Sequence, residues 1–286
     1  MRKQFLCDCG SGRNKENCCE TFPQVKVFMQ PISDPKEYRE LHANLKISAE
    51  FDMRYRGLLE FFGKDLISYK REHSPNQNRN EFLRIFSKYM TDYLEDHCPP
   101  SWKQCTPSFW EEFMFTYYPY CMHVTPHGKE VVKFLFQLKK FVKWLDKRAG
   151  TTWFEVIEKY VEESSFDLKM CEHLLNTLYL RDFPRIHHTD WKPKQDSDQI
   201  ERHFNKYTET LESLFEITRI TDDTVILTGL KSHRTYCIKG LPHKAVFPGL
   251  LMYGIIGKKD DDIFWNWCHT ESVYPQRAKN YIIIDS

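Results

Sequence analysis

The sequence predicts an α+β fold with three parts: a short metal-binding knuckle, a mainly α-helical body, and a small five-stranded β-barrel or sheet at the C-terminus. Three observations lead to this prediction. Four cysteines lie within thirteen residues near the start of the chain. Apolar residues then recur at three- and four-residue steps as far as about residue 180, which indicates amphipathic helices. From Leu214 onward apolar and polar residues alternate, which indicates strands.

The knuckle, predicted over residues 1–22, is defined by the cysteines Cys7, Cys9, Cys18 and Cys19. Four thiols at this density suit one tetrahedral ion, and zinc is the expected metal. Thiolate coordination would supply the folding energy of a segment too short for its own core. All four positions would be protein ligands, so we expect one structural zinc ion per chain. No apolar signal segment precedes the cysteines, which favours a reducing cytoplasm and metal over disulfides.

The run Cys-x-Cys-Gly-Ser-Gly, followed by basic and polar residues and a closing Cys-Cys, resembles the SEC-C motif. This is the zinc module at the C-terminus of the bacterial translocation ATPase SecA. The resemblance covers about residues 5–20 and departs from the motif at Asp8, where proline is usual. It implies a protein partner such as a SecB-like chaperone or the ribosome, with Arg13 and Lys15 as the basic residues of the loop. Nothing downstream resembles an ATPase, because no Gly-x-x-x-x-Gly-Lys-Ser/Thr loop is present.

Composition indicates a globular protein without strong overall charge. The 286 residues include 41 Lys and Arg against 40 Asp and Glu, so any binding to nucleic acid would need a local patch. No apolar run approaches the length of a membrane span. The six later cysteines are scattered and are expected to be buried free thiols.

An α-helical domain is predicted over residues 23–213. It begins with an extended linker, after which Asp34 is a plausible N-cap. Polar breaks, prolines and Gly150 separate the apolar-periodic runs that follow. The predicted helices are Pro35–His73, Phe82–Leu94, Thr106–Pro119, Gly128–Arg148, Trp153–Leu180 and Gln199–Leu214.

A β domain is predicted over residues 214–286, where five short alternating or apolar runs are separated by turn residues. Five short strands in about sixty residues are typical of a small barrel, SH3-like or OB-like, although an open sheet on the helices would fit as well. The predicted strands are Leu214–Ile220, Thr224–Thr228, Arg234–Lys239, Leu250–Ile256 and Ile263–Trp267.

A basic stripe on the helix over 128–148 is a candidate binding surface. Its members fall on the side opposite the apolar stripe and would follow a phosphate backbone, although such faces are more often only solvated. Barrel aromatics could stack on bases, with core packing as the alternative. The stripe consists of Lys133, Lys140, Lys143 and Lys147, and the aromatics are Tyr236, Tyr253, Trp265 and Trp267.

Enzyme chemistry has weaker support. His187, His188 and Asp190 would allow acid–base catalysis, and Cys171 would be a nucleophile. However, none of these residues belongs to a recognised catalytic motif. Two further metal sets have no recognised spacing. They are Cys98, Cys105, Cys121 and His123, and Cys171, His173, His187 and His188.

The sequence therefore favours a zinc-binding bacterial cytoplasmic adaptor whose knuckle and β module bind a protein or the ribosome. One alternative is a protein that binds single-stranded nucleic acid through the lysine stripe and the barrel aromatics. Another is a hydrolase or nuclease with a site assembled from residues distant in sequence. No catalytic residue is assigned, and the balance is against an enzyme.

Overall fold

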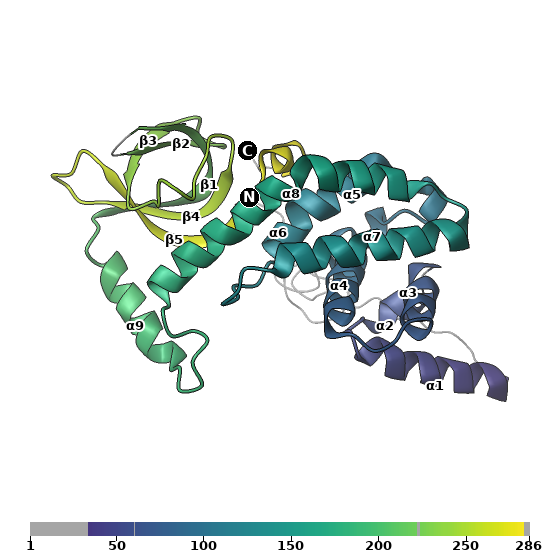
Figure 1. Cartoon of the computed structure of the whole chain (residues 1–286). Coiled ribbons are helices and arrows are strands. Elements are labelled where there is room, and N and C mark those ends of the chain that lie inside the picture. Colours follow the sequence, from purple (N-terminus) through teal and green to yellow (C-terminus); the bar gives the residue numbers. More distant parts are fainter. Residues whose placement is uncertain (1–33, 60, 222–223, 283–286) are drawn as a thin grey trace, which may run out of the picture. The chain divides into compact units, whose positions relative to one another are not determined.

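The structure is a computed structural model that describes residues 34–59, 61–221 and 224–282 (Figure 1). The predicted zinc ligands Cys7, Cys9, Cys18 and Cys19, and the loop residues Arg13 and Lys15, lie outside the described residues. The chain divides into two compact units, residues 1–43 and 44–286. The second unit holds most of the helices and all the strands. The domain boundaries after residues 22 and 213 stay predictions.

The predicted α+β class, with a helical body followed by five strands, is confirmed. Short 3₁₀ or π-helical turns connect or extend several helices. The α-helices are α1 (Pro35–Ala49), α2 (Tyr55–Leu59), α3 (Phe61–Arg71), α4 (Gln77–Lys88), α5 (Pro107–Glu112), α6 (Tyr118–Tyr120), α7 (Glu130–Ala149), α8 (Trp153–Asp182) and α9 (Pro193–Phe204).

The single helix predicted over residues 35–73 is wrong. Asp34 does cap its start, since the Lys36 N–H donates to the Asp34 carboxylate at 2.8 Å. The helix then ends at Ala49, and Asp52 takes a left-handed conformation with φ of 52°. This reversal buries both Phe51 and Met53 in the core. The apolar spacing continues through the break, so periodicity alone does not reveal it.

The aromatic residues of the helix predicted over Thr106–Pro119 lie in the helical core, where Trp110, Phe113 and Phe115 are completely buried. Both α4 and α5 widen at their ends into π-helical turns, Tyr89–Tyr93 and Phe113–Tyr117. The two turns pack on each other, with the Tyr89 ring 5.1 Å from that of Phe113 and 5.2 Å from that of Tyr117. Burial of these large rings accounts for much of the apolar area of the body.

The long helix α7 matches its prediction, because its whole apolar stripe from Val131 to Leu145 is buried and Gly150 ends it with φ of 65°. The last predicted helix is displaced, since α9 covers Pro193–Phe204 and not Gln199–Leu214. Pro193 stands in its first turn, where proline is tolerated. The residues from Glu209 to Glu216 instead pair with strand residues that lie 35 to 49 positions later in the chain.

The strands are β1 (Glu209–Ile220), β2 (Val225–Gly229), β3 (Thr235–Lys239), β4 (Leu251–Lys258) and β5 (Trp265–Tyr274). They pair in the order β1-β2-β3-β5-β4, and β4 also pairs with β1, so the pairing closes into a barrel. The seam between β3 and β5 is parallel and consists of two residue pairs, Ile238 with Trp265 and Lys239 with Asn266. The other pairs are antiparallel.

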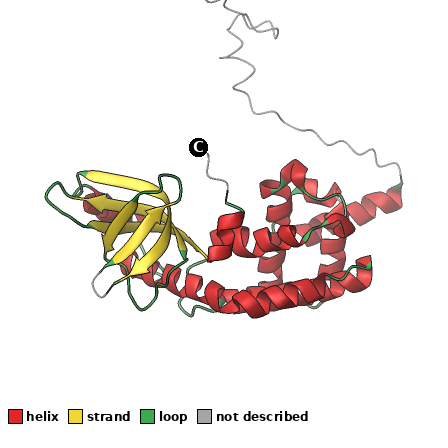
Figure 2. Ribbon diagram, turned by 90° about the horizontal axis from the view of Figure 1, so that it is seen from above, coloured by secondary structure: helices red, strands yellow, loops and turns green. Residues whose placement is uncertain are grey.

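The barrel is joined to the helices by α8, which packs along β5, and by the turn that follows β5 (Figures 1 and 2). This C-terminal turn, Gln276–Asn280, is 3₁₀-helical. Arg277 pairs with Glu163 of α8, and the Tyr281 hydroxyl donates to Glu111 of α5. Lys279 lies 2.6 Å from Glu216 of β1. The final described residues therefore fasten helices and barrel to each other.

Candidate functional site

The α7 lysine stripe, defined as Lys133, Lys140, Lys143 and Lys147, is exposed as the periodicity predicts. Three of its ammonium groups already have nearby partners, and that of Lys143 lies 5.4 Å from the centre of the Phe154 ring. Lys133 lies 2.7 Å from Glu130, and Lys140 lies 4.3 Å from the centre of the Phe136 ring. A polyanion binding here would compete with these contacts. The structure therefore shows the stripe on the surface without indicating a ligand.

The four barrel aromatics do not form one stacking surface. Trp267 is 3% exposed and Tyr236 is 9% exposed, and both pack edge-on against Phe215 inside the barrel. Trp265 is half-buried and packs edge-on against Tyr236. Tyr253 lines one groove and the edge of the buried Trp267 reaches another, both described below. Core packing, the alternative reading of these aromatics, applies to most of them.

The residues considered for catalysis do not meet. Cys171 is completely buried in α8, and burial raises the pKa of its thiol well above the ordinary value. His187, His188 and Asp190 lie exposed on the loop after α8, where Asp190 pairs with Arg185. Within the described part of the chain, no cluster of three or more His, Cys, Asp or Glu side chains is arranged to hold a metal ion. The two later metal sets predicted from cysteines and histidines are thus not assembled.

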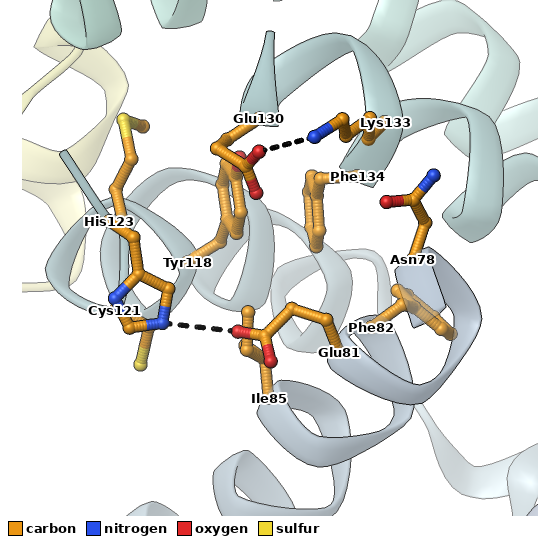
Figure 3. Close-up of a pocket in the computed structure, with 11 residues that line it drawn as sticks. Asn78, Glu81, Phe82, Ile85, Tyr118, Cys121, His123, Glu130, Lys133 and Phe134 are labelled. Atoms are coloured by element: carbon orange, nitrogen blue, oxygen red, sulfur yellow. Dashed lines mark hydrogen bonds and ion pairs between the residues drawn. The ribbon is translucent and has the colours of Figure 1, made fainter. Parts of the chain in front are cut away.

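A polar cleft that the sequence did not predict lies between α4 and the start of α7 (Figure 3). Glu81 projects from α4 toward His123, whose Nε2 lies 3.2 Å from Glu81 Oε1. Arg84 donates to both oxygens of the same carboxylate, at 2.6 and 2.9 Å. A small cavity of about 30 Å³, enough for a water molecule or two, and a cleft of about 480 Å³ share Glu81, His123 and Glu130 as lining residues.

Ion pairing and burial shift the pKa values of three groups in this cleft. Hydrogen bonds from Arg84 and His123 lower the pKa of Glu81 to about 2. The same bond to Glu81 raises the pKa of His123. Burial raises the pKa of the neighbouring Cys121 thiol, which keeps it protonated. The cleft is an ion-paired junction between α4 and the loop before α7. Glu81 pairs with Arg84 and His123, and Glu130 pairs with Lys133.

A second concave site has a different character. A groove of about 690 Å³ lies between the helical body and the barrel, and we call it the tyrosine groove. Its helical wall comes from the π-helical turns and α6, and its barrel wall comes from β1, β4 and β5. Five of its lining residues are tyrosines: Tyr93, Tyr117, Tyr120, Tyr253 and Tyr274.

Packing fixes the tyrosines of the groove without burying all of them. The rings of Tyr93 and Tyr117 lie 5.2 Å apart, and Tyr93 donates its hydroxyl to Glu112 at 3.1 Å. Tyr253 donates its hydroxyl to Glu212, and this contact is the main cause that raises its pKa to about 12. Tyr120 remains 68% exposed and Tyr93 44% exposed. Large rigid rings are thus held open to solvent in a concave surface.

Sequence reasoning missed this groove for a physical reason. The sequence placed Tyr93 and Tyr117 in amphipathic helices and Tyr253 in a strand, and it placed Tyr274 in no predicted element. Only the contact between helices and barrel brings them to one surface. A weak signal was available in the aromatic density of residues 109–120, which exceeds what a single buried helix face requires.

Comparisons with protein-family models, with curated proteins and with solved structures find no match to this chain. None of the helices in the described residues is both long and apolar enough to cross a membrane. Function must therefore be argued from the surfaces described above.

Proposed function

We propose that the protein is a bacterial cytoplasmic adaptor that binds a partner protein in the tyrosine groove, with the N-terminal zinc knuckle as a second binding surface. The observation that carries the proposal is the exposure of fixed tyrosine rings in a groove of about 690 Å³. Tyrosine is enriched at protein interfaces because it offers a large contact area with few rotatable bonds. The knuckle is included as a binding surface because its cysteine spacing resembles that of the SEC-C motif.

The groove favours an extended peptide segment over a nucleic acid. Its lining includes one carboxylate, Glu212, and one ammonium group, Lys231, so it has no excess positive charge for phosphates. Aromatic grooves bind apolar and proline side chains of extended segments, and a carboxylate at the edge favours a nearby Lys or Arg. The expected partner segment therefore combines apolar residues with a basic one.

The proposal is tested by comparing full-length variants in affinity purification followed by binding of the purified partner. Tyr93→Ala combined with Tyr120→Ala removes the two most exposed rings of the groove and is expected to weaken binding at least tenfold. Tyr55→Ala is the control, because Tyr55 is 48% exposed on α2 and does not line the groove. Equal binding by the groove variant and the control would refute the role of the groove.

A separate variant tests the knuckle. Replacing Cys18 and Cys19 by Ser removes two predicted zinc ligands. If the knuckle binds a partner, this variant loses that partner while circular dichroism of the helical body stays unchanged. If it keeps every partner of the wild type, the knuckle is not a binding surface.

A further inference from the structure

A second groove, on a different face of the barrel, has the opposite electrostatic character. It has a volume of about 750 Å³ and lies between the end of α8, the end of α9, and β5. We call it the basic groove. Its charged lining residues are Arg181, Asp182, Arg202, His203 and Lys206, and it is completed by Ile200, Tyr207, Gly240, Asn266, Trp267 and Cys268.

Arg181, one of the lining residues, is held by three hydrogen bonds. Its Nε and Nη2 donate to the two oxygens of Asp182 at 2.7 and 3.3 Å, and its Nη1 donates to the Gly240 carbonyl at 2.7 Å. A guanidinium has five N–H donors, so two are left over. Asp182 thus positions Arg181, and the negative charge of Asp182 is neutralised by Arg181.

The other two permanent cations of the groove, Arg202 and Lys206, differ from Arg181 in their contacts. Among the residues that the structure describes, Arg202 and Lys206 form no ion pair, and both are exposed. Arg202 is oriented by its Nε–H, which donates to the Asp198 carbonyl at 3.0 Å. This differs from the α7 lysine stripe, where Lys133 is neutralised by Glu130. The basic groove therefore carries an excess of positive charge in a concave surface.

An aromatic ring stands beside these cations. Tyr207 packs so closely on β4 that a Cβ at Gly257 would lie 2.6 Å from its ring. Its hydroxyl lies 3.3 Å from His203 Nε2, and burial is the main cause that raises its pKa to about 12. The half-buried ring is thus a fixed part of the groove, next to His203 and Lys206.

We propose that the basic groove binds the phosphate backbone of single-stranded nucleic acid. Cations carried on two helices and the segment after α9 suit a chain of separated phosphates better than a single carboxylate. The Tyr207 ring offers a flat apolar surface to a base, which an acidic peptide does not need. This site is distinct from the α7 lysine stripe and from the tyrosine groove, and neither of them depends on it.

The test uses the full-length protein and a fluorescein-labelled 20-nucleotide oligothymidylate, followed by fluorescence anisotropy. The wild type is expected to bind at low salt, with affinity falling steeply as salt increases; three phosphate contacts give a log–log slope of about −2. The Arg202→Glu/Lys206→Glu variant is expected to bind at least tenfold more weakly. The Lys140→Glu/Lys143→Glu variant carries the same change of charge on the α7 lysine stripe and is expected to change affinity less than twofold.

Several outcomes would overturn the proposal. The first is absence of binding at low salt, and the second is equal weakening by the two charge-reversal variants, which would indicate unspecific attraction. Equal affinity for a 20-base-pair duplex would exclude a single-strand site. Tight binding of inorganic tripolyphosphate without binding of the oligonucleotide would assign the groove to a free polyphosphate. Circular dichroism of both variants checks that each is folded.

Discussion

Asp146 and Glu172 each cap the helix that carries the other. Asp146, near the end of α7, accepts hydrogen bonds from the Trp153 and Phe154 N–H groups at the start of α8, at 2.9 and 2.8 Å. Glu172 of α8 accepts the Glu130 N–H at the start of α7 at 2.6 Å. Neither helix has a side-chain cap from its own N-cap residue. The two carboxylates therefore fix the α7–α8 hairpin at both ends.

Removing either cap is expected to destabilise the protein. Asp146→Ala and Glu172→Ala should each lower the free energy of unfolding by about 1–2 kcal/mol, measured by urea denaturation. Burial raises the pKa of Glu172, so its charged form is disfavoured on folding, and Glu172→Gln should cost less than Glu172→Ala. Glu162→Ala, on the exposed surface of α8, is the control and should change little. A loss in the control equal to that of the caps would contradict this account.

The Glu81–His123 contact predicts a pH dependence. Because the contact raises the pKa of His123 above 6.5, its stabilisation is complete below that pH and is lost as pH rises through the raised value. The stabilisation that comes from the lowered pKa of Glu81 is lost only as pH falls from 4.5 toward 2. An NMR titration of the imidazole should show a raised pKa that returns toward 6.5 in Glu81→Gln. Glu130→Gln removes a weaker Coulombic attraction to the imidazolium and should lower the pKa of His123 less.

The backbones of β4 and β5 approach so closely at Gly254 that a larger residue there is expected to destabilise the fold. A Cβ at this position would lie 2.1 Å from the His269 carbonyl oxygen, in the irregular part of the β4–β5 pairing. Gly254→Ala is expected to lower the free energy of unfolding by about 3 kcal/mol or more. Gly57→Ala is the control, since there the added methyl would meet the flexible Met53 side chain and a helical alanine is favoured. Urea denaturation compares the free energies of unfolding of the two variants, and an equal loss in both would contradict the prediction.

The predicted knuckle is tested by metal analysis of protein purified without a metal-affinity tag. We expect about one zinc ion per chain, because four thiolates close a tetrahedral site. The Cys18→Ser/Cys19→Ser variant should lose the ion. Absence of metal in the wild type would refute the knuckle, and metal that survives in the variant would place a site elsewhere.

The sequence predicted what local periodicity determines. The α7 stripe, the Gly150 stop and the approximate positions of five strands follow from neighbouring residues and are confirmed. The start of β1 was missed because Glu209 to Leu214 carries charged residues on a pattern that also fits a helix. Its pairing with β4 decides the conformation, and the paired residues lie 39 to 49 positions away in the chain.

The candidate sites were harder to predict than the fold. A lysine stripe is visible in a sequence because its members share one helix face. The pairing of Lys133 with Glu130 is local to α7, whereas the grouping of Arg181, Arg202 and Lys206 in one groove depends on which elements become neighbours. The tyrosine groove and the basic groove both combine helix and barrel residues, so neither leaves a motif.

The C-terminal turn has a kinetic consequence. Arg277 and Tyr281 tie the end of the barrel to α8 and α5, while Lys279 ties the same turn to β1. These contacts hold the two walls of the tyrosine groove to each other. A partner segment would meet a receptor already in its binding shape, so association would require no closing motion and only the incoming segment would lose conformational freedom.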